Sequence, residues 1–88
     1  MKKIFEVTYK GHHIQVENTW FNGERLYVDG KLQDQNLGFA FDRATLYGVI
    51  KSHEGEKQKI KVSLGGAITV ECRIFVDHEL IYPEHGIQ

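Results

Sequence analysis

Hydrophobic residues alternate with polar ones along most of this chain, and this period of two constrains the fold more than any other feature. Residues at every second position face the same side of a β-strand, whereas one face of a helix repeats with a period near 3.6. No stretch keeps the helical period over three turns. The longest alternating sets are Phe5, Val7 and Tyr9; Ile60, Val62 and Leu64; and Ile68, Val70, Cys72, Ile74 and Val76. The pattern therefore predicts strands throughout the chain.

About seven or eight short strands are expected, because glycine or polar breaks recur roughly every 8–12 residues, a spacing typical of a β-sandwich or a small barrel. We predict an all-β fold, an antiparallel β-sandwich, formed by one domain over residues 1–88. The one helical candidate is the short piece from Asp42 to Leu46. The predicted core consists of Val7, Ile14, Val16, Leu26, Val28, Ile60, Val62, Val70, Cys72, Ile74 and Val76.

Two similar stretches, "RLYVDGKL" from Arg25 and "RIFVDHEL" from Arg73, each contain a turn signal. Asp29-Gly30 predicts a type I′ hairpin turn, which needs positive φ at both central residues. Asp77-His78 predicts the same turn, since histidine is among the residues enriched at positive φ. The aspartates are therefore expected to serve turns and not proton transfer.

The similarity extends upstream if "IQVEN", residues 14–18, is aligned with "ITVEC", residues 68–72. This alignment makes "TWFNGE", residues 19–24, an insertion in the first copy. It predicts two strands joined by a loop in the first copy, and one long strand in the second. An internal duplication and two hairpins that follow the same rules remain alternatives.

The charge balance argues against a nucleic-acid partner. Eleven basic and twelve acidic residues give a net charge of −1, whereas nucleic-acid binding usually needs a basic excess. Lysines recur at Lys57, Lys59 and Lys61, but Glu54 and Glu56 lie beside them in the sequence. The chain has no apolar run long enough for a signal peptide or a membrane span. Together with the single cysteine, this predicts a soluble cytoplasmic protein with no membrane partner.

No motif predicts catalysis, a metal site or a cofactor. His12 and His13 are adjacent on a predicted strand, so they point to opposite faces and cannot chelate one ion together. Cys72 falls on an apolar face and is expected to be a buried, inert thiol. Ser52 and Ser63 do not lie in a nucleophile-elbow context. We therefore expect a protein that is not an enzyme, and an enzyme remains only the last alternative.

The stretch from about His12 to Pro83 resembles the domain of the Fas apoptosis inhibitory molecule family. The residues that carry the resemblance are "HIQVE" from His13, "GERLYVDGK" from Gly23, "TLYGV" from Thr45 and "ITVECRIFVDHEL" from Ile68. The resemblance implies an antiparallel β-sandwich without catalytic residues. It also implies work through protein contacts, which in that family restrain death-receptor signalling and protect clients from aggregation. That family carries two such domains, and this chain has room for one.

The candidate binding residues are Trp20, Phe21 and Asn22 in the apparent insertion, together with Tyr27 and Phe75. Large aromatic residues on a loop are common at interfaces and in sugar-binding sites, so Trp20 is predicted to be partly exposed at a contact surface. The alternative is that Trp20 caps one end of the core. Tyr27 and Phe75 occupy equivalent positions of the two similar stretches and predict an aromatic pair on an outer face. The first hypothesis is a protein-interaction module that binds a partner protein or itself. The second is a sandwich that binds a small ligand or carbohydrate.

Overall fold

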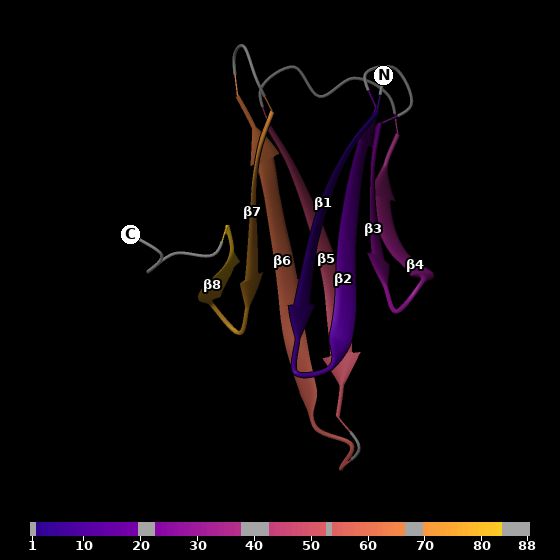
Figure 1. The fold of residues 1–88 in the computed structure, drawn as a ribbon, viewed down its shortest axis with the longest axis vertical. Helices are drawn as coiled ribbons and strands as arrows, with labels where there is room; N and C mark the ends of the chain where they lie inside the picture. Colours follow the sequence, from indigo (N-terminus) through magenta and orange to yellow (C-terminus); the bar gives the residue numbers. More distant parts are fainter. Residues whose placement is uncertain (1, 20–22, 38–42, 53, 67–69, 84–88) are drawn as a thin grey trace.

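A computed structural model shows that the described part of the chain forms eight β-strands in two four-stranded antiparallel sheets (Figure 1). The structure describes residues 2–19, 23–37, 43–52, 54–66 and 70–83, and within these residues it contains no helix. The strands are β1 (Lys2–Tyr9), β2 (His12–Thr19), β3 (Gly23–Val28), β4 (Lys31–Asn36), β5 (Arg43–Lys51), β6 (Lys57–Gly65), β7 (Glu71–Val76) and β8 (Glu79–Tyr82). The predicted all-β sandwich is confirmed. The helical candidate from Asp42 is wrong, because β5 already begins at Arg43.

Each sheet is a meander in which every strand pairs with its neighbours in the sequence. The first sheet has the order β1-β2-β3-β4 and the second has the order β5-β6-β7-β8. Figure 1 shows the long strands of both sheets running along the longest axis of the molecule. Their apolar faces enclose one core, because the alternation puts the hydrophobic set of each strand on one side.

All the predicted core residues except Val7 and Val70 are buried, and these two are partly buried and pack against the core. The structure adds five residues to the predicted set. They are Phe5, Ala44, Leu46, Ile50 and Leu64. Cys72 is buried with the rest, as predicted.

The two sheets repeat one another in register. Ile14 pairs with Val28 and Val16 with Leu26 in the first sheet; in the second, Ile60 pairs with Val76 and Val62 with Ile74. The register also shifts at the same place in both sheets, between Leu26 and Tyr27 in one and between Ile74 and Phe75 in the other. The similarity seen in the sequence therefore covers whole sheets, with β2 equivalent to β6 and β3 to β7.

The two turn aspartates make the same hydrogen bonds. The Asp29 N–H donates to the His13 carbonyl (2.8 Å), and the His13 N–H donates to Asp29 Oδ1 (2.9 Å). Asp77 exchanges the same two bonds with Lys59, at 2.9 and 3.0 Å. All four turn residues have positive φ: Asp29 52°, Gly30 82°, Asp77 48° and His78 72°. The turn assignment is confirmed, and each aspartate also ties its turn to the neighbouring strand.

The interpretation of "TWFNGE" as an insertion is wrong. It matched β2 with the start of β7, whereas the pairing makes β2 equivalent to β6. Residues 20–22 connect β2 to β3, and the longer connection from Gly66 to Val70 joins β6 to β7. The second sheet therefore has its own connection at this place, and the first has no extra loop.

Candidate functional site

Three of the predicted binding residues, Trp20, Phe21 and Asn22, lie outside the described residues. The strand ends on either side of them are tied together, since Thr19 Oγ1 donates a hydrogen bond to the Gly23 carbonyl oxygen (3.0 Å). A side chain at Gly23 is not tolerated: its φ is +85°, and a Cβ would lie 1.9 Å from the Asn36 carbonyl oxygen. The partial exposure of Trp20 stays a prediction.

Tyr27 and Phe75 both lie half-buried on outer faces, as the alternation predicts. They belong to different sheets, however. Tyr27 pairs with Gln15 and Leu32 in the first sheet, and Phe75 occupies the equivalent position in the second. The prediction that the two residues form an aromatic pair on one outer face is therefore wrong, and they do not form one site.

A clearer site emerges from the edges of the two sheets. The outer edge of β5 is covered by side chains of β4. The Tyr47 N–H donates to Asp34 Oδ2 (2.9 Å) and the Val49 N–H donates to Gln33 Oε1 (3.1 Å). Gly48 lies between them, and a Cβ there would meet Leu26 and Gln33 at 2.9 and 3.2 Å. The two sheets are therefore closed against each other along β4 and β5.

At the equivalent edge of β1, no described side chain provides such cover. The hairpin pair Tyr9–His12 flanks a two-residue turn, and hydrogen-bonded and non-hydrogen-bonded pairs alternate from there. The amides of Thr8, Glu6 and Ile4 consequently point away from β2. Among the residues that the structure describes, none donates to or accepts from these outward-facing backbone groups. Within the described ranges, the outer edge of β1 is therefore unpaired.

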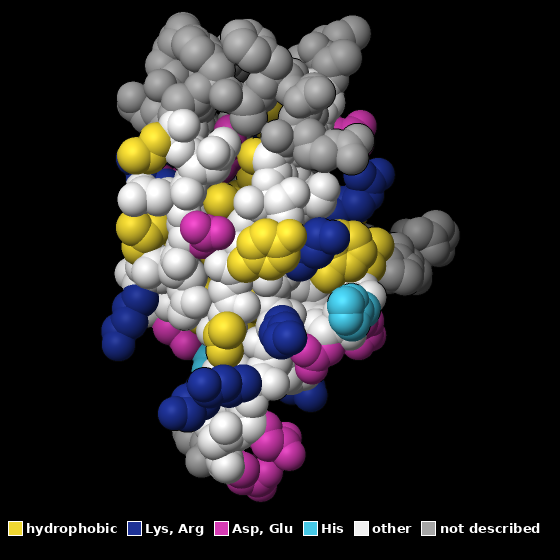
Figure 2. All heavy atoms as spheres, turned by 180° about the vertical axis from the view of Figure 1, so that it is seen from behind, with side chains coloured by type: hydrophobic (Ala, Val, Ile, Leu, Met, Phe, Trp, Pro, Cys, Tyr) yellow, Lys and Arg dark blue, Asp and Glu magenta, His cyan; other side chains and the backbone are white. Residues whose placement is uncertain are grey.

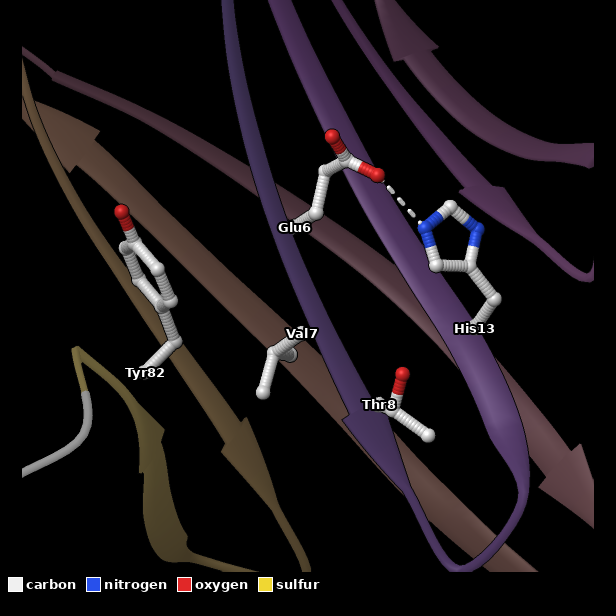
Figure 3. Close-up of a pocket in the computed structure, with 5 residues that line it drawn as sticks. All are labelled: Glu6, Val7, Thr8, His13 and Tyr82. Atoms are coloured by element: carbon white, nitrogen blue, oxygen red, sulfur yellow. Dashed lines mark hydrogen bonds and ion pairs between the residues drawn. The ribbon is translucent and has the colours of Figure 1, made fainter.

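An open groove of about 440 Å³ runs beside this edge. It is lined by Glu6, Val7 and Thr8 of β1, His13 of β2 and Tyr82 of β8 (Figure 3). Glu6 Oε1 and His13 Nε2 lie 2.7 Å apart on one side of the groove. On the other side the Tyr82 ring packs edge-on against Phe5, with ring centroids 6.0 Å apart. The groove therefore has one polar wall and one apolar wall.

The pKa shifts in the described region arise from burial and from the hydrogen bonds of the turns. Burial raises the pKa of the Cys72 thiol to about 12, which leaves it without nucleophilic thiolate at neutral pH. Hydrogen bonds from His12 and from the His13 N–H lower the pKa of Asp29, and those from the Lys59 N–H and Gln58 lower that of Asp77. In the described part of the chain, no three His, Cys, Asp or Glu side chains are grouped to hold a metal ion.

A buried polar cluster lies at the ends of β2, β3 and β4, and no pattern in the sequence predicted it. Glu24 is 5% exposed, and its two oxygens accept hydrogen bonds from Asn18 Nδ2 (2.9 Å) and Asn36 Nδ2 (3.0 Å). A space of only about 40 Å³ adjoins Asn18 and Glu24, room for little more than a water molecule. We assign this cluster to the structure of the first sheet and not to binding.

The comparisons with known proteins give no relative. No family model, no curated protein and no solved structure matches the chain. In the described ranges, no helix has the length and apolar character needed to cross a membrane. The groove along β1 is therefore interpreted from its own geometry.

Proposed function

We propose that this protein is a non-catalytic interaction module that binds an extended segment of a partner protein along the free edge of β1. The observation that carries the proposal is the difference between two equivalent edges. Gln33 and Asp34 occupy the outward amides of β5, whereas the outward amides of β1 face an open groove. An added strand would pair with these amides, and the groove would receive its side chains.

The walls of the groove indicate what kind of segment fits. Val7 and Tyr82 offer apolar surface, and Glu6 with His13 offers a polar pair. Because side chains alternate along a strand, a peptide of alternating apolar and polar residues would match both walls. Lys2 and Lys3 precede the pairing amides and Lys10 follows them, so acidic residues at both ends of the peptide would complement β1.

The same charges disfavour a second copy of this chain as the partner. If two β1 strands paired antiparallel about Glu6, the two Glu6 side chains would lie opposite each other. Lys2 and Lys3 of each copy would lie near Lys10 of the other. Like charges placed directly opposite each other destabilise a strand pair by about 0.2–1 kcal/mol. A heterologous segment avoids all these contacts.

The resemblance to the Fas apoptosis inhibitory molecule family also implies an interaction role. A small-molecule site is less well supported, since only Val7 and Tyr82 are apolar among the described residues that line the groove. Ligand pockets of similar volume are usually lined mainly by apolar side chains. A segment that binds through backbone hydrogen bonds does not need an apolar pocket.

The test is titration of the isotope-labelled protein with a peptide of about eight residues, the length of an ordinary strand. The peptide alternates valine with threonine and carries aspartate at both ends. We expect amide shift changes concentrated on β1, with the largest at Glu6 and Thr8. Changes concentrated on Tyr27 or Phe75 would place the binding surface elsewhere.

Thr8→Pro sharpens this test, because proline removes one outward N–H that takes no part in the β1–β2 ladder. Proline is tolerated at such edge positions, so the fold should persist while peptide binding weakens at least tenfold. Thr8→Val keeps the N–H and is the matched control. Wild-type affinity in Thr8→Pro would contradict pairing along β1.

A further inference from the structure

The outer face of the second sheet carries an excess of positive charge, although the net charge of the chain as a whole is −1. The odd-numbered residues of β5, β6 and β7 point outward, because their even-numbered neighbours fill the core. Among the outward-facing side chains of these three strands that the structure describes, five are cations and one is a carboxylate. The cations are Lys51, Lys57, Lys59, Lys61 and Arg73, and the carboxylate is Glu71.

Few of these charges form ion pairs, although Lys59 interacts electrostatically with the Asp77 carboxylate. Arg73 lies 3.9 Å from Glu71, but within the described ranges no acidic side chain lies at ion-pairing distance from the lysines of β5 and β6. Glu54 and Glu56, which neighbour the lysines in the sequence, lie at the turn between β5 and β6 and not on the face. Lys51 and Lys57 even pair directly opposite each other, an arrangement that costs stability.

Aromatic side chains interleave with the cations. One row across the sheet runs Tyr47, Lys61, Phe75 and Leu80 in register. Tyr47 is 59% exposed. Figure 2 shows this side of the molecule from behind, with dark-blue cationic side chains between yellow hydrophobic ones and with acidic side chains both beside them and at the tip below. The rings lie two strands apart, roughly 9–10 Å.

The equivalent row of the first sheet lacks the cation and one of the two rings. It runs Glu6, Gln15, Tyr27 and Leu32, with a carboxylate in place of Tyr47 and an amide in place of Lys61. Glu6 is paired with His13 (2.7 Å). The fold therefore does not itself require a cationic aromatic face, since the same architecture forms without one.

We propose that this face, centred on Tyr47, Lys61 and Phe75, binds single-stranded nucleic acid. Cations would contact the phosphates while the two rings stack on exposed bases, a combination that serves sequence-independent single-strand binding. A duplex hides the faces of its bases, so it would use only the charges. The net charge of −1 argued against a nucleic-acid partner for the chain as a whole. A net charge, however, does not show how the charges are distributed between the faces.

The test is fluorescence anisotropy of a labelled oligothymidylate at 50 mM salt. We expect dissociation constants of roughly 1–100 μM, the range of non-specific contacts. If four phosphates are neutralised, affinity should fall roughly 50-fold between 50 and 200 mM salt. A duplex of the same length should bind more weakly than the single strand.

Paired variants separate stacking from charge. Tyr47→Ala with Phe75→Ala should weaken binding at least about fivefold, whereas Tyr27→Ala on the other sheet should not.

Lys59→Gln with Lys61→Gln should lower the salt dependence by about 1.4 logarithmic units per tenfold salt, and Arg25→Gln is its control. Thr8→Pro should leave oligonucleotide binding intact, so failure here and failure at the β1 edge are distinguishable.

Three results would overturn the proposal. The first is the absence of any anisotropy change at about 100 μM protein. The second is equal binding of single strand, duplex and heparin with no loss in the aromatic double variant, which would show attraction by charge alone. The third is binding to vesicles that contain phosphatidylserine without binding to the oligonucleotide.

Discussion

The two sheets share strand order, register, turn geometry and the position of a register shift, yet they differ in what they present to solvent. At equivalent places, β1 carries Glu6 where β5 carries Tyr47, and β2 carries Gln15 where β6 carries Lys61. The shared features involve inward-facing residues and turns, and the differences involve outward-facing residues and edges. The repeated architecture therefore acts as a scaffold, and the residues that break the repeat are the candidates for function.

The comparison predicts its largest effect in the core. Leu26 and Ile74 occupy equivalent positions, and each is 0% exposed. Leu26→Ala and Ile74→Ala should each destabilise the fold by about 2–5 kcal/mol, from lost burial and the cavity left behind. Urea unfolding measures both. A loss below about 1 kcal/mol in one of them would show that the two halves of the core are not equivalent.

The next effect contrasts Glu24 with Cys72, which occupy equivalent positions of β3 and β7. Glu24→Ala should cost about 1–3 kcal/mol, because the amides of Asn18 and Asn36 lose their acceptor. Cys72→Ala should cost about 1–2 kcal/mol as a small core truncation. Unfolding curves give both values. Native Cys72 should also react slowly with a bulky thiol reagent, and rapid labelling would contradict its burial.

A smaller effect separates the two turns. Gly30 has a φ of 82° and its counterpart His78 a φ of 72°. Gly30→Val should destabilise by more than ~1 kcal/mol, because a β-branched residue is strained at positive φ. His78→Gly should be neutral or mildly stabilising. Equal melting temperatures for Gly30→Val and the wild-type protein would contradict the turn geometry.

The smallest predicted effect is a dependence on acid pH. The pKa values of Asp29 and Asp77 are lowered in the folded protein, so the unfolded chain binds protons more tightly at these groups. Their stabilisation is present above the ordinary value of 3.8 and is lost as the pH falls below it. Melting temperatures between pH 5 and 2 should therefore fall less steeply in Asp29→Asn with Asp77→Asn. An unchanged slope would mean that other carboxylates dominate.

The sequence predicted the strands, the turns and most of the core, since these depend on local alternation and on glycine, aspartate and histidine at positive φ. It failed where the answer depended on which strands become neighbours. The alignment of Ile14 with Ile68 followed residue identity, but pairing made Ile14 equivalent to Ile60. The open edge of β1 and the covered edge of β5 could not be recognised either, because Gln33 and Asp34 reach β5 only after the sheets pack. The cationic face was not predicted, because Glu54 and Glu56 are close to the lysines in sequence but lie at the turn.

The meander order has a consequence for how the chain folds. Every strand pair joins consecutive strands, so each pairing closes only a short loop, and closing a short loop costs little chain entropy. Sandwiches with Greek-key connections must instead bring distant strands together, and proteins rich in such distant pairings fold slowly. We therefore expect this domain to fold faster than most β-sandwiches of its size. In each sheet, strand pairing would begin at the hairpin turns. Packing of the two sheets against each other would be the later step.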